Sequence, residues 1–104
     1  MIPKEKTKKF EEDKAGDVAL INEVVTKYKD AEEFAAKLTV YLSQKYGSDF
    51  GGKLKISYDV VDKAFTLDCG FDTATFEKVD AEELAAQLKL FREQAFLRRA
   101  EKRK

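Results

Sequence analysis

The sequence predicts an α+β fold, a small single domain of order α(α)ββα in which an antiparallel β-hairpin packs against N-terminal and C-terminal helices. Three observations predict it. The chain has 104 residues, which is enough for one modest core. Apolar residues recur with helical spacing before residue 47 and after residue 80. Between these regions, two stretches alternate strictly between apolar and polar residues, as half-buried strands do.

The N-terminal part combines a charged segment with two helical patterns. Residues 1–16 hold five lysines and four acids without apolar periodicity, so we expect a flexible charged arm. Asp17 is a suitable N-cap for a helix that begins at residue 18. Helical spacing favours a helix over 18–28, and the β-branched residues there leave a strand as the alternative. A second cap at Asp30 predicts a kink or break near it, and Gly47 suits the end of the second helix.

Residues 53–71 carry the clearest pattern. Two runs, 54–60 and 65–71, each place four apolar side chains on one face. A turn centred on residues 62–63 would pair Val60 with Phe65 and put all eight apolar side chains on the same face. A four-residue loop at 61–64 gives the same register. A short third strand is expected around 73–78.

The stretch SDFGGK at 48–53 precedes the first strand. It contains two glycines and a lysine, but it lacks the spacing of a phosphate-binding loop and leads into a strand rather than a helix. We interpret it as a linker.

Nine residues at 30–38, DAEEFAAKL, recur as DAEELAAQL at 80–88 with seven identities. Both copies begin with an aspartate followed three residues later by a glutamate, which is the spacing of a capping box, and both are rich in alanine. The similarity does not extend into the neighbouring strand, as a duplicated unit would. We therefore interpret the match as two helices that begin in the same way.

The last helix carries more apolar surface than a hairpin can cover. Either the first helix covers the excess or a second chain does. Because small domains often gain stability by association, we expect a homodimer. The residues of this expected interface are Leu90, Phe91, Phe96 and Leu97.

The residue types argue against catalysis. The chain has no histidine, which is the commonest general base and metal ligand. Its one cysteine, Cys69, lies on the apolar hairpin face and is expected to be a buried, unreactive thiol. Asp59 and Asp68 share the polar hairpin face, but that face offers no pocket to make them an acid/base pair. We expect a protein that is not an enzyme, with no cofactor and no metal ion.

Other features concern location. No apolar run approaches the roughly 20 residues that a membrane span needs, and the N-terminal residues lack the apolar core of a signal peptide. The single cysteine agrees with a reducing compartment. A cytoplasmic location is expected.

Charge is uneven although the net charge is zero. We expect one folded domain over residues 17–97, followed by a C-terminal tail at 98–104. Residues 57–83 of the domain hold eight acids and two lysines, whereas the tail holds five basic residues and one acid. We expect a non-catalytic protein–protein interaction module whose acidic hairpin face binds a basic partner. The residues of that face are Asp59, Asp62, Asp68, Asp72 and Glu77.

Such a module would act as an inhibitor or adaptor of a nucleic-acid-binding protein, in the manner of the small charge-rich host-takeover proteins of bacteriophages. The alternative is a nucleic-acid-binding protein, dimeric through its last helix, that contacts phosphates with its basic C-terminal tail. The residues of that tail are Arg98, Arg99, Lys102, Arg103 and Lys104.

Overall fold

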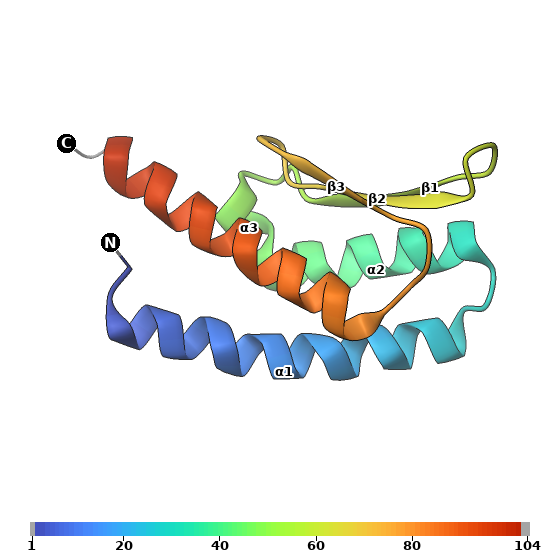
Figure 1. Cartoon of the computed structure of the whole chain (residues 1–104), viewed down its shortest axis with the longest axis horizontal. Helices are drawn as coiled ribbons and strands as arrows, with labels where there is room; N and C mark the ends of the chain where they lie inside the picture. The colour runs from blue at the N-terminus through green and yellow to red at the C-terminus, as the bar shows by residue number, and fades with distance from the viewer. Residues whose placement is uncertain (1, 103–104) are drawn as a thin grey trace.

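The computed structural model describes residues 2–102 and has an α+β fold (Figure 1). Its elements are α1 (Lys4–Lys27), α2 (Ala31–Tyr46), the short 3-10 helix η1 (Gly47–Phe50), β1 (Lys55–Asp59), β2 (Ala64–Asp68), β3 (Thr73–Phe76) and α3 (Ala81–Lys102). The antiparallel sheet, in the order β1-β2-β3, forms one outer layer. Helices α2 and α3 lie beneath it, and α1 forms the opposite outer layer. The predicted fold class is confirmed.

The two similar nine-residue segments both begin helices. The Asp30 carboxylate accepts a hydrogen bond from the Glu33 N–H at 3.0 Å. The Asp80 carboxylate accepts from the N–H groups of Glu82 and Glu83 at 3.0 and 3.3 Å. The break before Asp30 and the short third strand are also confirmed. The equivalent buried pairs in the two segments are Phe34 and Leu84, Ala35 and Ala85, and Leu38 and Leu88.

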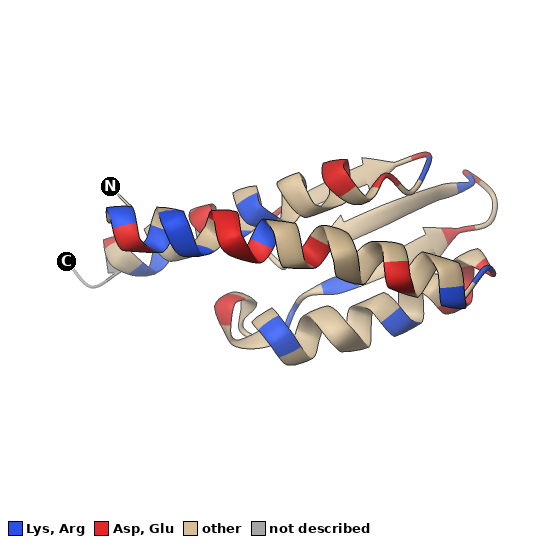
Figure 2. Cartoon of the chain, turned by 90° about the horizontal axis from the view of Figure 1, so that it is seen from below, with Lys and Arg blue, Asp and Glu red and all other residues tan. Residues whose placement is uncertain are grey.

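The flexible arm expected at 1–16 is wrong. Helix α1 begins at Lys4 and continues through Asp17, so that residue is inside a helix and not its cap. Acids and bases are interspersed along this helix (Figure 2). Its one early aromatic residue, Phe10, is buried, and Glu11 forms a 3.0 Å ion pair with Lys89 of α3. The segment is helical because α3 supplies partners that are remote in the sequence.

The connection after α2 also differs from the prediction. Helix α2 ends at Tyr46 with Gly47 as its C-cap, as predicted, but Gly47 has a right-handed φ of −54° and the chain continues into η1. The turn is made by Gly51, whose φ of 60° is left-handed. Phe50 is buried beneath it. The first half of the stretch interpreted as a linker is therefore a turn of 3-10 helix, anchored in the core by Phe50.

The strands pair in a register two residues from the predicted one. Tyr58 faces Phe65 and Ile56 faces Leu67, whereas Val60 was expected to face Phe65. The turn consequently spans residues 60–63. A shift of two residues preserves which strand side chains point inward, so the predicted apolar face is retained except at Val60, which falls in the turn and is exposed.

The edge of β1 is covered by α2. The Thr39 hydroxyl accepts a hydrogen bond from the Ile56 N–H at 2.8 Å and lies 2.9 Å from the Ile56 carbonyl oxygen. The Ser43 hydroxyl donates to the Leu54 carbonyl at 3.3 Å. Helix α2 thus occupies backbone groups through which an exposed strand could pair with another chain.

The apolar excess of α3 is largely used within the chain. Phe91, expected at a dimer interface, is only 1% exposed and belongs to the core. Phe96 and Leu97 are half-buried, and the Lys6 ammonium of α1 lies 5.9 Å from the Phe96 ring centroid. Of the four residues only Leu90 is exposed, at 47%. Of the two interpretations given above, the one in which the first helix covers the apolar excess of the last helix therefore fits the structure.

Among the helices within residues 2–102, none is both long enough and apolar enough to cross a membrane.

Candidate functional site

The turn between β1 and β2, residues 60–63, projects at the end of the molecule opposite the termini (Figure 1). We call this turn, together with Asp59 at the end of β1, the hairpin tip. One carboxylate oxygen of Asp59 accepts hydrogen bonds from the Val61 and Asp62 N–H groups, at 2.8 and 3.0 Å. Lys63 completes the turn with a left-handed φ of 53°. The Asp59 side chain thus starts the turn one residue earlier than predicted, which accounts for the change of register.

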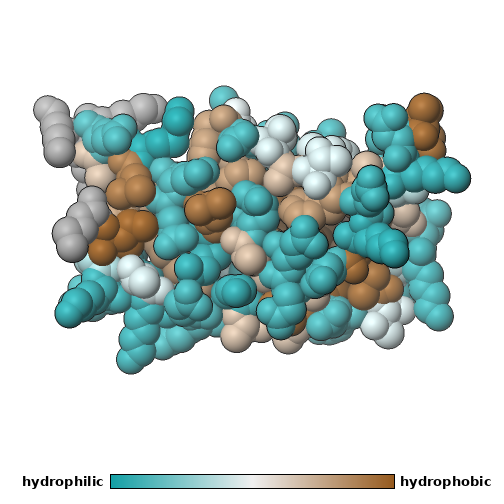
Figure 3. Space-filling model, viewed as in Figure 1, coloured by the Kyte–Doolittle hydropathy of each residue, from teal (hydrophilic) through white to brown (hydrophobic). Residues whose placement is uncertain are grey.

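This turn exposes two adjacent valines. Val60 is 59% exposed and Val61 is 86% exposed, the highest values among the large apolar residues that the structure leaves in contact with water. Figure 3 shows an apolar patch at this corner, bordered by hydrophilic surface. A projecting apolar pair of this kind contributes nothing to the core of the chain.

Acidic side chains outnumber basic ones at the hairpin tip, which also carries the exposed Lys63. Asp59 and Asp62 belong to it, and both are exposed. Glu77 follows Phe76, which pairs with Phe65 near the start of β2, so Glu77 lies at the same end of the sheet. The acidic first turn of α2 lies beneath the tip (Figure 1), where Glu32 borders a shallow groove. We call Asp59, Asp62 and Glu77 the tip acids.

The other two residues of the predicted acidic face lie elsewhere. Asp68 ends β2 and pairs with Lys55, four residues along the strand from the tip, or about 13 Å at ~3.3 Å per residue. It accepts a hydrogen bond from the Gly70 N–H. Asp72 lies in the next turn and accepts from the Thr73 N–H. The five predicted acids therefore form two groups, and Asp59 and Asp68 are not a carboxylate pair.

The predicted basic tail is partly helical. Arg98 and Arg99 belong to α3, with the Arg98 guanidinium 4.7 Å from the Phe71 ring centroid and Arg99 3.8 Å from the Asp49 carboxylate. Lys102 is the last residue of the helix, and Arg103 and Lys104 lie outside the described residues. Two of the five predicted cations are thus held against other parts of the fold.

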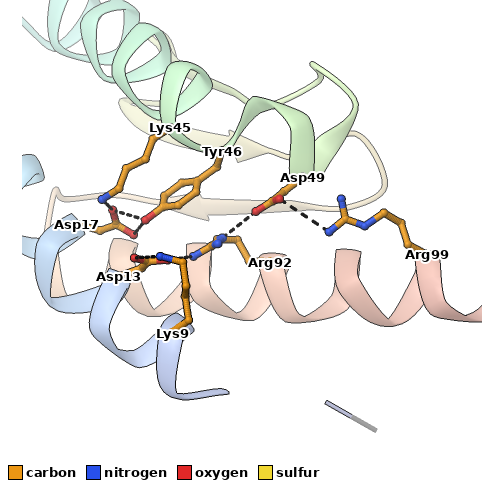
Figure 4. Close-up of polar contacts among 8 residues, drawn as sticks. All are labelled: Lys9, Asp13, Asp17, Lys45, Tyr46, Asp49, Arg92 and Arg99. Atoms are coloured by element: carbon orange, nitrogen blue, oxygen red, sulfur yellow. Dashed lines mark hydrogen bonds and ion pairs between the residues drawn. The ribbon is translucent and has the colours of Figure 1, made fainter. Parts of the chain in front are cut away.

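A buried ionic network, which the sequence did not reveal, joins the helices beneath the sheet (Figure 4). Arg92 of α3 is 8% exposed and donates to the carboxylates of Asp13 at 2.8 Å and Asp49 at 2.9 Å. Its guanidinium lies between two rings, 4.7 Å from the centroid of Phe10 and 4.0 Å from that of Tyr46. One cation therefore ties α1, α2 and η1 to α3.

A second part of the network is centred on Asp17, which is 1% exposed. Its carboxylate accepts hydrogen bonds from the Lys45 ammonium at 2.8 Å and from the Tyr46 hydroxyl at 2.9 and 3.0 Å. Both partners come from α2. Every buried side-chain polar atom within residues 2–101 has a hydrogen-bond partner, so the buried charges of Asp17 and Arg92 are paired.

Helical spacing could have revealed both parts of the network. Arg92 follows Ala85 and Leu88 on one face of α3, and Asp17 precedes Ile21 and Val24 on one face of α1. A charged residue at a position of the apolar stripe indicates a buried charge that needs a partner. The spacing does not indicate which residues of other elements pair with Arg92 and Asp17.

The protonation behaviour of these groups indicates a structural role. Burial would raise the pKa of Asp13, but the hydrogen bond and charge of Arg92 outweigh it and lower that pKa. Burial would likewise lower the pKa of Arg92, but its bonds to Asp13 and Asp49 raise it. Burial, reinforced by Asp17, raises the pKa of Tyr46. Each group thus stays in one protonation state near neutral pH, unlike a catalytic acid or base.

Cys69 is buried as predicted, at 1% exposure. Burial raises the pKa of its thiol, and the sulfur lies 3.4 Å from the Asp72 carbonyl oxygen. The thiol is therefore protonated near neutral pH and is not an activated nucleophile.

A metal site would need several ligand side chains close together. Within residues 2–102, no three His, Cys, Asp or Glu side chains come together in this way.

No protein-family model, curated protein or solved structure matches this chain. The indications of function therefore come from its surfaces.

Proposed function

We propose that this chain is a non-catalytic interaction module whose hairpin tip docks onto a basic partner protein. The observation that carries the proposal is the projecting pair Val60 and Val61, surrounded by the tip acids. Burying a valine side chain at an interface is worth about 1.5 kcal/mol or more, so two of them supply a useful apolar centre.

The arrangement resembles the general anatomy of protein interfaces, in which an apolar centre is surrounded by a polar rim. The rim here is acidic, through Asp62 and Glu77 in particular, so a partner with a basic surface would associate faster and be selected over an acidic one. Proteins that bind nucleic acids present such surfaces. The chain would then act as an inhibitor or adaptor of a nucleic-acid-binding protein.

Site-specific photo-crosslinking tests the proposal. A photoreactive phenylalanine analogue is placed at Val61 in the full chain and incubated with nuclease-treated bacterial lysate. The matched control carries the same analogue at Val40, which is 50% exposed on α2. We expect a basic protein to be crosslinked from position 61 and not from position 40.

Charge variants then separate the two acidic groups. The double change Asp62→Asn with Glu77→Gln should reduce the crosslink at least severalfold at low salt. The control, Asp68→Asn with Asp72→Asn, removes the same charge from the other end of the sheet and should leave it unchanged. Equal crosslinking from both valine positions, or equal loss in both double variants, would contradict the proposal.

A further inference from the structure

A separate pocket lies at the other end of the hairpin, between η1, the turn after β2 and the last turns of α3. Its volume is about 330 Å³, within the range of small-molecule sites. We propose that it binds a small phosphate monoester, whose phosphate contacts Lys53, Arg98 and Arg99 while its apolar part lies against Phe50 and Phe71.

The charge of the pocket suits a dianion. Arg98 and Lys53 have no carboxylate within ion-pair distance among the described residues. Arg99 reaches Asp49 at 3.8 Å, but that carboxylate is already bound by Arg92 at 2.9 Å. The pocket therefore has three cations in its lining but only one carboxylate, Asp49, and that carboxylate is also bound by Arg92. A phosphate monoester supplies the missing negative charge, and arginine is well suited to bind it with paired N–H groups.

The position of Lys53 is set by Gly70. A Cβ at Gly70 would come within 2.9 Å of the Lys53 Cβ and 3.0 Å of its Cδ, and the φ of Gly70, +95°, also disfavours other residues. The absence of a side chain therefore lets the Lys53 stem lie across the turn beside the pocket. A cation held by its stem loses less conformational entropy when it binds an anion.

The aromatic wall favours an ester over free phosphate. Phe50 and Phe71 lie with ring centroids 6.4 Å apart, and Phe91 backs Phe71 at 6.2 Å. The Arg98 guanidinium lies over Phe71, an arrangement that leaves its edge N–H groups available to an anion. An apolar group attached to the phosphate would gain contact with the same rings.

Titration of the full chain with phenyl phosphate, followed by amide chemical shifts, tests the proposal. We expect saturable shifts at residues 50–53, 69–71 and 95–99, with affinity about tenfold or more above that for inorganic phosphate. Lys53→Gln and Arg98→Gln should each weaken binding about tenfold, the usual effect of removing a charged hydrogen bond. Lys78→Gln, an exposed lysine outside the pocket, is the control and should bind as the wild type does.

Three results would overturn the proposal. One is the absence of saturable shifts. A second is unchanged affinity in Lys53→Gln, which replaces an exposed residue and is expected to keep the fold. The third is tighter, steeply salt-dependent binding of a short single-stranded oligonucleotide at the same residues, which would identify a nucleic-acid backbone as the ligand. As a second variant, Gly70→Ala should weaken phenyl phosphate binding by displacing Lys53 without removing a charge. None of these results depends on the hairpin tip.

Discussion

Asp13, Asp17 and Asp49 lie between the helices, where each accepts a hydrogen bond from a cation of another element, whereas Asp59 and Asp62 lie at the hairpin tip and are exposed. The side chains are chemically identical. Their surroundings give them different roles, because a carboxylate removed from water is costly unless it is paired. At the tip, water solvates the carboxylates and leaves them available to a partner.

The comparison shows that charge count alone does not locate a binding surface. Each acid between the helices is already paired with Arg92 or Lys45, so these acids add less to the field outside the molecule. The tip acids are not paired with any cation among the described residues. Substitutions between the helices should therefore lower the free energy of unfolding, whereas substitutions at the hairpin tip should weaken binding to a partner.

Loss of the central cation should have the largest effect. Arg92→Met keeps much of the packing between Phe10 and Tyr46 but leaves Asp13 and Asp49 without their main partner. We expect the free energy of unfolding to fall by about 2–4 kcal/mol, because both carboxylates are half-buried and keep longer ion pairs with Lys9 and Arg99. Urea denaturation measures it, with Lys78→Met as an exposed control. A loss below about 1 kcal/mol would mean that the buried pairing is not important for stability.

Removing one hydroxyl should have a smaller effect. Tyr46→Phe takes away a hydrogen bond to the buried Asp17 carboxylate, leaving only Lys45 as its partner, and should cost about 1.5–3 kcal/mol. Tyr58→Phe is the matched control, because the half-buried Tyr58 takes part in no side-chain hydrogen bond within residues 2–101. Equal denaturation midpoints for the two variants would contradict the assigned role of Tyr46.

The pH dependence of stability should reveal Asp13. Its pKa in the folded chain lies below the ordinary value of 3.8 because Arg92 outweighs the effect of burial. A lowered folded pKa contributes stability that is present above pH 3.8 and is lost as the pH falls below it. Asp13→Asn should therefore reduce the fall in stability between pH 5 and about pH 3. Denaturation at several pH values measures this, and an unchanged slope would contradict it.

The same kind of change at the hairpin tip should have the smallest effect on folding. Asp62→Asn with Glu77→Gln should alter the free energy of unfolding by no more than about 0.5 kcal/mol, as is usual for exposed substitutions. The urea titration used for Arg92→Met measures it. A larger loss would mean that the tip acids stabilise the fold, and would weaken their assignment to a partner.

Much of the architecture follows from local sequence. The caps at Asp30 and Asp80, most inward positions of the strands and the third strand were predicted from spacing within a few residues, and the same spacing favoured a helix over a strand at 18–28. Such features depend on contacts between near neighbours in the chain, which the sequence displays directly. Cys69 was placed correctly for the same reason, since alternation fixes which face a strand residue occupies.

The candidate site was predicted only in part. The acids of the hairpin were identified, but alternation does not fix register, and the shift of two residues moved Val60 from the core to the tip while separating Asp68 from Asp59. One side-chain oxygen of Asp59, bonded to two N–H groups of the turn, accounts for that difference.

Residue order alone was enough to indicate most helix and strand positions, which of their faces are apolar, and how unevenly charge is distributed. Long-range packing was needed to make the N-terminal charged segment a helix, to bury Arg92, and to bring Lys53 and Arg98 to one pocket. The physical reason is the range of the interactions. Arg92 and Asp13 are 79 residues apart, and nothing local to either reveals that packing α1 along α3 will bring them to 2.8 Å.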